Sequence, residues 1–356
     1  MFKIAKITFG TAIAILVLTP LFSESAHAQS NDSIFLKSNA NGGSSVRRGR
    51  ISQTSPNGVT IQVKGKAEEI PSQKIKKISY AGEPRQLGTA RGRIETGRYD
   101  DGLTELAKIS GTVDSDFIQS EIDFLKAFCQ AQKSLKGGDV TAQQAGIAIR
   151  NFTQKYPDSY HFYPATDLLG KLLVAIGKPE FAEKEFAKIS RSQWPAMTIK
   201  GFFERGNALL LTGNLETAKQ CFESIATIDA NDDESQQFKM VAQCQLAKIM
   251  ALSGQLDSGQ AIVEKIIKDE NPDNAMLFAY AYNALGTCHL QAQQPKPAAI
   301  AFLHTELLYS NELAPHAEAL YNLAKIWPVL EETDRANRAR QALKSRYRNT
   351  YWALQL

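Results

Sequence analysis

The acidic run at positions 229 to 233 is the part of this sequence that most resembles a metal site. Asp229, Asn231 and Asp233 alternate as the first ligands of a calcium-binding loop do. Such a loop needs a glycine at its sixth position and a bidentate glutamate at its twelfth, but this chain lacks that glycine and has Met240 at the twelfth position. Aspartates in such runs also cap helices by accepting hydrogen bonds from free backbone N–H groups. We therefore expect Asp232 or Asp233 to cap a helix.

The histidines have no metal-binding spacing. His161, His289, His304 and His316 include no pair four residues apart, and the sequence contains no HExxH motif. It also lacks the G-x-S-x-G nucleophile motif, a phosphate-binding glycine loop and the dinucleotide fingerprint. We therefore predict a protein that is not an enzyme and has no catalytic residues, cofactor or metal.

Four cysteines could react with one another if the protein is exported. They are Cys129, Cys221, Cys244 and Cys288, and in an oxidising compartment Cys221 and Cys244 are the nearest candidates for a disulfide because they lie in consecutive predicted helices. The alternative is four small buried side chains between helices, which is a common place for cysteine. We favour the second interpretation, and the sequence leaves both open.

Helices must position most of these residues, because the chain after Pro84 has the 3.6-residue period of amphipathic helices. Residues 202–230 place a small residue at Gly206, a turn at Gly213, another small residue at Ala218 and an aromatic at Phe222. This segment resembles a tetratricopeptide (TPR) hairpin, whose two helices pack closely where small residues let the backbones approach. Equivalent turn positions recur at Gly97, Gly138, Gly177, Gly213, Gly254, Gln293 and Glu331. The resemblance implies a TPR-like α-solenoid of about seven helical hairpins.

Residues 29–82 have strand signals instead. Val59, Ile61 and Val63 alternate on one face, Asn57-Gly58 suits a hairpin turn, and Asn41-Gly42-Gly43 suits another. Four or five short strands are expected. The order of a glycine-containing strand, an Asn-Gly hairpin and an alternating strand resembles the SH3-like barrels that precede TPR arrays in some exported bacterial proteins. The predicted fold class is thus mainly α, with a small all-β domain before the solenoid.

The basic charge is concentrated in this β segment, which has nine basic residues against three acidic ones, while the whole chain carries +4. Candidate contacts to an anionic cell-wall polymer or a membrane surface are Arg47, Arg48, Arg50, Lys76 and Lys77, because exposed cations attract anions without catalytic geometry. The alternative, which we favour, is a solvated outer face with charged edge strands that resist pairing. We expect no nucleic acid partner, because no aromatic stacking strand is present.

The first 28 residues have the pattern of a secretory signal peptide. Lys3 and Lys6 precede an apolar run, and Ala26-His27-Ala28 matches a cleavage site. The run is shorter than the roughly 20 residues of a membrane-spanning helix, and no cysteine follows it for lipid attachment. We expect a signal peptide at 1–28, a small β-barrel domain at 29–82 and TPR-like repeats at 83–356. The protein would then be periplasmic or secreted.

A second resemblance supports this compartment. Lys155-Tyr156-Pro157-Asp158-Ser159, followed by Tyr163-Pro164-Ala165, resembles a junction in the cell-envelope TPR proteins of diderm bacteria. Its local reason is that tyrosine packs at a helix end and proline stops the helix.

TPR arrays bind partners in a concave groove formed by the first helix of each hairpin. Transferred to this sequence, the family's groove positions are Lys200, Phe203, Asn207, Tyr280, Asn283, Tyr321 and Lys325. The family's lysine-and-asparagine clamp for terminal carboxylates is incomplete, because Phe203 occupies one of its positions, so an internal peptide segment is the implied ligand. For each of these residues, ordinary packing between helices is the alternative interpretation.

We predict a non-enzymatic scaffold or adaptor of the bacterial cell envelope, which binds a partner peptide or protein in this groove. The second hypothesis is a cell-wall or polysaccharide-associated module. In that case the basic β domain binds an acidic polymer and the helices serve for self-association.

Overall fold

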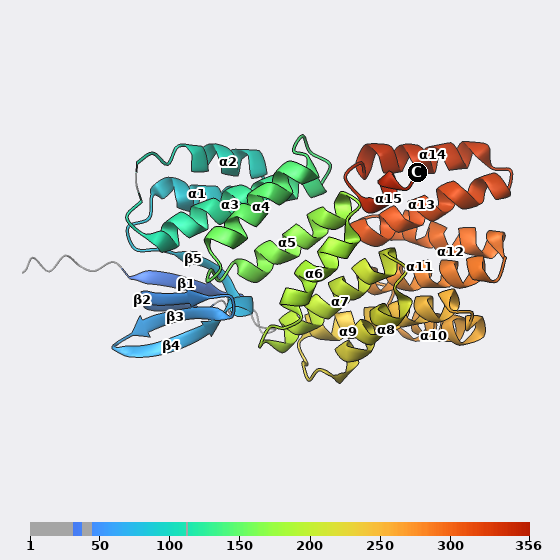
Figure 1. Ribbon diagram of the computed structural model, residues 1–356, viewed down its shortest axis with the longest axis horizontal. Coiled ribbons are helices and arrows are strands. Elements are labelled where there is room, and N and C mark those ends of the chain that lie inside the picture. The colour runs from blue at the N-terminus through green and yellow to red at the C-terminus, as the bar shows by residue number, and fades with distance from the viewer. Residues whose placement is uncertain (1–30, 38–44, 112) are drawn as a thin grey trace, which may run out of the picture. The chain divides into compact units, whose positions relative to one another are not determined.

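The computed structural model in Figure 1 describes residues 31–37, 45–111 and 113–356. The expected signal peptide and the expected turn at Asn41-Gly42-Gly43 lie outside these residues. The stretch Asn31–Leu356 forms one compact unit. In the part of the chain that the structure describes, no helix is both long and apolar enough to cross a membrane.

Five strands open the described chain and form one antiparallel sheet in the order β4-β3-β2-β1-β5. They are β1 (Asp32–Leu36), β2 (Val46–Ser55), β3 (Gly58–Val63), β4 (Lys66–Pro71) and β5 (Ile75–Ser79). Val59 and Ile61 are fully buried, as their alternation predicted, and Asn57 lies in the turn from β2 to β3. The expected short strands are therefore present, as one five-stranded antiparallel sheet.

One glycine lets β2 cross β3 closely. A Cβ atom at Gly49 would lie 2.1 Å from the backbone oxygen of Gln62. No side chain fits at that distance, so the glycine within the strand has a steric reason.

Helices follow in pairs joined by tight turns. They are α1 (Arg85–Glu95), α2 (Tyr99–Ala107), α3 (Asp116–Leu135), α4 (Ala142–Lys155), α5 (Phe162–Ala175), α6 (Pro179–Ile189), α7 (Pro195–Leu211), α8 (Leu215–Thr227), α9 (Asp233–Leu252), α10 (Leu256–Asp269), α11 (Ala275–Gln291), α12 (Pro295–Leu308), α13 (Leu313–Val329) and α14 (Thr333–Arg346). A short helix, α15 (Tyr351–Leu354), comes last. The described residues thus contain the seven helical hairpins that the turn positions predicted.

The turn positions show left-handed backbone even where glycine is missing. Gly97, Gly177, Gly213 and Gly254 have φ between 73° and 85°, while Gln293 and Glu331 have φ of 58° and 62°. In the second hairpin the left-handed residue is Gly137, with φ of 76°, and not Gly138 as expected. Here the Gly137 N–H donates to the Ser134 oxygen and the Gly138 N–H to the Lys133 oxygen, the usual helix-ending pattern. Two adjacent glycines made the sequence ambiguous by one residue.

Small residues and aromatics hold each hairpin together as the TPR resemblance implies. A Cβ atom at Gly206 would lie 2.6 Å from the ring of Phe222, and the pairs Gly170–Phe186 and Gly286–Phe302 repeat this close approach. The three phenylalanines are at most 1% exposed. Because the ring fills the space that a side chain would need, the second helix can pack directly on the backbone of the first.

All four cysteines are buried free thiols in the structure. Burial raises the pKa of Cys129 and of Cys244 to about 12 and that of Cys288 to about 11. Cys221 and Cys244 are not joined, so the interpretation of small buried side chains describes this structure. Raised pKa values leave little thiolate at neutral pH, which makes these sulfurs unreactive.

Candidate functional site

The polar side chains that the first helices of successive hairpins present to one another form the candidate site. We call this set the first-helix surface. It comprises Asp167 and Lys171 on α5, Lys200, Glu204 and Asn207 on α7, Gln245 and Lys248 on α9, Asn283 on α11, and Glu318, Tyr321 and Lys325 on α13. Five of the seven predicted groove residues belong to it.

An ion-pair cluster joins α5 to α7. The Asp167 carboxylate accepts from Lys171 Nζ at 3.0 Å and from Lys200 Nζ at 3.1 Å, and Lys171 also lies 3.3 Å from Glu204. Burial raises the pKa of Asp167, but the two ammonium groups outweigh it and the net pKa is lowered. The lysine side chains are 37% and 28% exposed. Two cations are therefore fixed in position while part of their surface faces solvent.

Asp167 was missed in the sequence analysis, although a signal for it exists. It lies three residues before the small residue Gly170, as Phe203 lies before Gly206 and Asn283 before Gly286. Reading that position in every hairpin would have found it. Its Oδ1 is buried and has no hydrogen-bond partner among the described residues.

The two predicted asparagines bind neighbouring helices. Asn207 Oδ1 accepts a hydrogen bond from Gln245 Nε2 at 2.5 Å. Asn283 Nδ2 donates to the Pro315 oxygen at 2.8 Å, and Asn283 is 1% exposed. Its Oδ1 has no hydrogen-bond partner among the described residues. Both amides therefore fix one first helix against the next.

A further ion pair joins α9 to α13 around the Asn283 amide. Lys248 pairs with Glu318, which lies seventy positions later in the chain. The Glu318 carboxylate also lies 3.4 Å from Asn283 Nδ2. Helices α9, α11 and α13 are thus held together by one polar network.

Phe203 and Tyr280 lie in the core. They are 2% and 9% exposed, and their ring centroids are 5.6 Å apart in an edge-to-face arrangement. Phe203 also packs on Phe222 and Phe238. Both side chains are therefore buried in packing between helices, which is the alternative interpretation of the predicted groove residues, and α9 packs against both α7 and α11.

Tyr321 and Lys325 lie at the last hairpin and are accessible. Lys325 is exposed, and its Nζ lies 3.3 Å from the Tyr321 hydroxyl. Lys325 also lines an open pocket of about 470 Å³ between the α11–α12 turn and α13, with Gln293, Asn322 and Val329. This pocket leaves room for a ligand beside Lys325.

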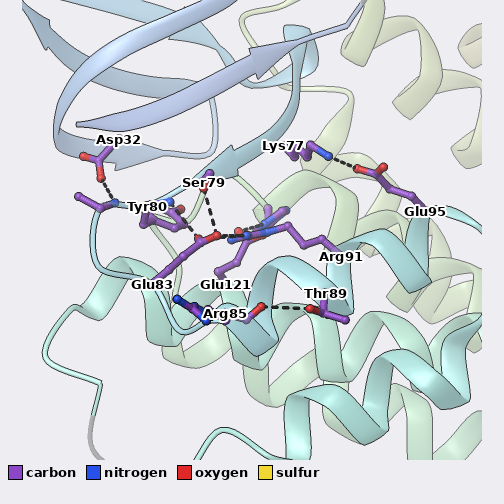
Figure 2. A network of polar contacts seen from close by, with 12 residues as sticks. Asp32, Lys77, Ser79, Tyr80, Glu83, Arg85, Thr89, Arg91, Glu95 and Glu121 are labelled. Carbon is purple, nitrogen blue, oxygen red and sulfur yellow. Dashed lines mark hydrogen bonds and ion pairs between the residues drawn. The ribbon is translucent and has the colours of Figure 1, made fainter. Parts of the chain in front are cut away.

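A second polar cluster joins the sheet to the helices, as Figure 2 shows. Arg91 on α1 donates to Glu121 on α3 at 2.9 Å and to both oxygens of Glu83 at 2.8 and 3.0 Å. Glu83 also accepts from the Ser79 hydroxyl and from the Tyr80 N–H, both at the end of β5. The cluster therefore links the last strand, the first helix and the second hairpin.

Glu121 is the centre of this cluster. It is 2% exposed and also accepts from the Tyr160 hydroxyl at 2.8 Å, while His161 Nε2 lies at the same distance. Burial raises its pKa, but His161 and Arg91 outweigh burial and lower the pKa to about 2. Glutamate, histidine and tyrosine together could transfer protons. Here each oxygen of the Glu121 carboxylate already has a partner. The arrangement suits a structural junction.

Two further contacts join the sheet to the helices, one from the β2–β3 turn and one from β5. Trp194 Nε1, at the start of α7, donates to the backbone oxygen of Asn57 in the β2–β3 turn at 2.5 Å. Lys77 pairs with Glu95 at 3.0 Å. These contacts and the Arg91 cluster hold the sheet on the helical array.

The five basic candidates of the sheet do not share one free patch. Arg47 pairs with Glu68 at 3.0 Å, and Lys77 with Glu95. Arg48, Arg50 and Lys76 are exposed and have no ion pair within the described chain.

Asp232 is the N-cap of α9, as predicted, and its carboxylate accepts from the Ser235 N–H at 2.9 Å. Across the described residues, no group of three histidine, cysteine, aspartate or glutamate side chains is arranged to hold a metal ion.

Comparisons with known proteins give a fold and no family. No family model and no curated protein matches this chain. A Rap protein complexed with competence and sporulation factor resembles it with a TM-score of 0.51 at 15% identity, over 76% of either chain. NprR in complex with its cognate peptide NprX gives 0.46 at 13% identity, over 76% of this chain and 80% of that one. PilW, a type IV pilus biogenesis factor, gives 0.36 at 13% identity, over 76% and 96%. The helical array thus has a TPR-like fold.

Proposed function

We propose that this protein is a non-enzymatic interaction scaffold of the bacterial cell envelope, which binds a partner protein or peptide on its first-helix surface. The observation that carries the proposal is the fixed, partly exposed pair of cations Lys171 and Lys200 around Asp167. Charged groups that are held in place before binding lose little side-chain freedom when a partner arrives. The exposed Lys325 beside the α11–α13 pocket offers a second contact region.

The fold comparison supports the same class of function. The Rap protein, whose structure resembles this chain, was solved in complex with competence and sporulation factor. A helical array without a metal cluster or a catalytic motif in its described part is suited to recognition.

The finer parts of the proposal rest on sequence and topology. The sheet order β4-β3-β2-β1-β5, with a 3-10 turn at Ser72–Lys74 between β4 and β5, supports an SH3-like barrel. We propose a boundary at 82/83, because the last strand ends at Ser79 and the first helix begins at Arg85. Export rests on the signal-peptide pattern of residues 1–28.

The alternative function is binding of an acidic wall polymer or an anionic membrane surface by the sheet. It is supported by the three exposed cations Arg48, Arg50 and Lys76. Binding of the polymer or membrane should then weaken strongly with added salt, since exposed charges are screened at high ionic strength. Charge reversal of these three residues should then abolish retention on wall material.

The test is photocrosslinking in cells from selected positions. A photoreactive amino acid replaces Lys200 or Lys325 in one pair of strains. In a control strain it replaces Lys219 on the second helix α8, whose side chain is 43% exposed. We expect a discrete protein adduct from the first two positions that is weak or missing from the control. Equal adducts from all three, or none, would contradict binding on the first-helix surface.

A further inference from the structure

The last nine residues return to hairpins far earlier in the chain. After α14 the chain passes buried Tyr347 and forms α15, the segment between the last hairpin and the C-terminus in Figure 1. Residues 348 to 356 then contact the turn ends of α3, α5 and α7. We call residues 348–356 the tail.

Three side chains of the tail donate to backbone oxygens at helix ends. The Arg348 guanidinium donates to the Gly138 oxygen, and Asn349 Nδ2 donates to the Ser134 oxygen at 2.9 Å, both after or within the last turn of α3. The Tyr351 hydroxyl donates to the Leu211 oxygen at 3.2 Å, at the end of α7. Helix C-termini carry partial negative charge, and a carbonyl oxygen can accept a second hydrogen bond, as the Ser134 oxygen does here beside the one from the Gly137 N–H. Hydrogen-bond donors, and positively charged ones above all, bind favourably at such helix ends.

An aromatic contact joins the tail to the first-helix surface. The ring of Trp352 lies 5.0 Å from the ring of Tyr321 on α13, which is a predicted groove residue. On the other side of the tail, a Cβ atom at Gly177 in the α5–α6 turn would lie 3.3 Å from Leu354. The tail therefore lies between the last hairpin and the turns of the second, third and fourth hairpins.

Most of the tail lies outside the core, and Trp352 is its one side chain that packs against the apolar cluster of α12, α13 and α14. Helix α15 has no buried residue, and Arg348 and Leu354 are exposed. Its specific contacts with the helices are side-chain donors on backbone oxygens and the tilted ring pair of Trp352 and Tyr321. Elements with few buried apolar contacts are those that open at low cost.

We propose that the tail is an internal ligand of a binding site formed by the helix ends at Ser134, Gly138 and Leu211 and by the Tyr321 ring. The site takes a short segment with an arginine, an amide and two adjacent aromatic side chains, in the pattern of Arg348-Asn349-Thr350-Tyr351-Trp352. A partner segment of this basic and aromatic type competes with the tail. The partner part rests on the proposed function, whereas the occupancy of the site by the tail does not.

The test uses a synthetic peptide of residues 348–356 with a fluorescent label. It is titrated into the full chain and into a chain that ends at Tyr347, which keeps the buried tyrosine and its contact with His316. We expect the peptide to bind the shortened chain at least tenfold more tightly than the full chain, because the site is free only there. A scrambled peptide should bind neither chain.

Point variants of the full chain test the same proposal if the shortened chain does not fold. Asn349→Ala and Trp352→Ala each remove one contact of the tail, and Gln355→Ala, at an exposed residue, is the matched control. The first two variants should bind the added peptide several-fold more tightly than the control does.

Two results would overturn the proposal: equal binding of the peptide to full, variant and shortened chains, or no binding to any folded variant. If the peptide binds the shortened chain while Lys200 and Lys325 give no partner adduct, the internal ligand stands and the proposed function fails. The two failures are thereby distinguishable.

Discussion

The ring of Phe203 meets the ring of Tyr280 edge to face, 5.6 Å between centroids, inside the contact between α7 and α11. Both residues occupy positions at which TPR proteins were expected to offer side chains to a ligand. Here the first helices are close enough for these side chains to bind one another. Partner binding is therefore expected from the charged residues around them.

Replacing Phe203 by alanine should destabilise the protein strongly. The side chain is 2% exposed and packs on three other rings. Removal of a buried phenylalanine typically costs about 3–5 kcal/mol. Denaturant unfolding followed by circular dichroism measures the loss, and Phe202→Ala, at a half-buried neighbour, is the matched control. A loss under about 1 kcal/mol would place Phe203 outside the core.

Breaking the sheet-to-helix cluster at Glu121 should cost more than removing a surface ion pair. Glu121→Ala leaves the buried Arg91 without one of its two carboxylates. Removal of one partner of a buried pair commonly costs about 3–5 kcal/mol. The free energy of unfolding is the measurement. Glu68→Ala, which breaks the exposed pair with Arg47, is the control and should change it by less than about 1 kcal/mol.

Acid should weaken the same cluster at low pH. The pKa of Glu121 falls from 4.5 to about 2 on folding. A lowered pKa in the folded state stabilises the protein above the unfolded value, and this contribution is lost as pH falls from 4.5 through about 2. Stability of the parent and of Glu121→Gln, measured from pH 6 to 2, should converge over this window. Parallel curves would refute the assignment.

His316 should make the last hairpin sensitive at a higher pH. It is 4% exposed and lies 2.6 Å from the Tyr347 hydroxyl. Burial, and then Arg346, lower its pKa from 6.5 to about 4. Between pH 6.5 and about 4, His316 is protonated more readily in the unfolded chain than in the folded one. The free energy of unfolding should therefore keep this contribution above pH 6.5 and lose it as the pH falls towards 4.

This difference in pKa corresponds to at most about 3 kcal/mol between pH 6.5 and 4. The variant His316→Gln should not show that slope. Equilibrium unfolding of both proteins at half-unit steps of pH measures it, and equal slopes would contradict a buried neutral histidine.

Substitution by glycine should stabilise the protein at the two turns that lack a glycine. Gln293 and Glu331 have φ of 58° and 62°, where residues other than glycine are strained by about 1 kcal/mol. Gln293→Gly and Glu331→Gly should therefore raise stability by up to about 1 kcal/mol. Gly213→Ala, at a φ of 75°, should lower it by a similar amount. Thermal unfolding compares the three variants, and destabilisation by both glycine substitutions would disprove the strain.

The sequence predicted the structure correctly where a local feature, such as a turn, a cap or a close backbone approach, requires one type of residue. Gly206 and Phe222 predicted a hairpin because only a residue without a side chain lets that ring approach, and the structure has the ring there. The turn at Gln293 was found from spacing alone, without its glycine. A cap at Asp232 or Asp233 was predicted from the free N–H groups of a helix start, and Asp232 is the N-cap.

It was a poor guide where contacts join distant segments. Arg91, Glu83 and Glu121 carry no shared motif, and their cluster exists only because α1, α3 and the end of β5 meet. For Phe203 the sequence left groove and packing as alternatives, and its burial follows from contacts between helices that are distant in the chain. The return of the tail to Ser134 and Leu211 had no signal at all.

The sequence by itself determined the helical hairpins, their approximate number, the short strands before them and the buried positions Val59 and Ile61. These follow from periodicity, turn residues and close backbone approach, which act within a few tens of residues. Only the tertiary structure decided which polar side chains pair, which predicted groove residues are buried, and where the tail lies. Those outcomes depend on how far each hairpin rotates against the next, and that rotation is set by the summed packing of many side chains.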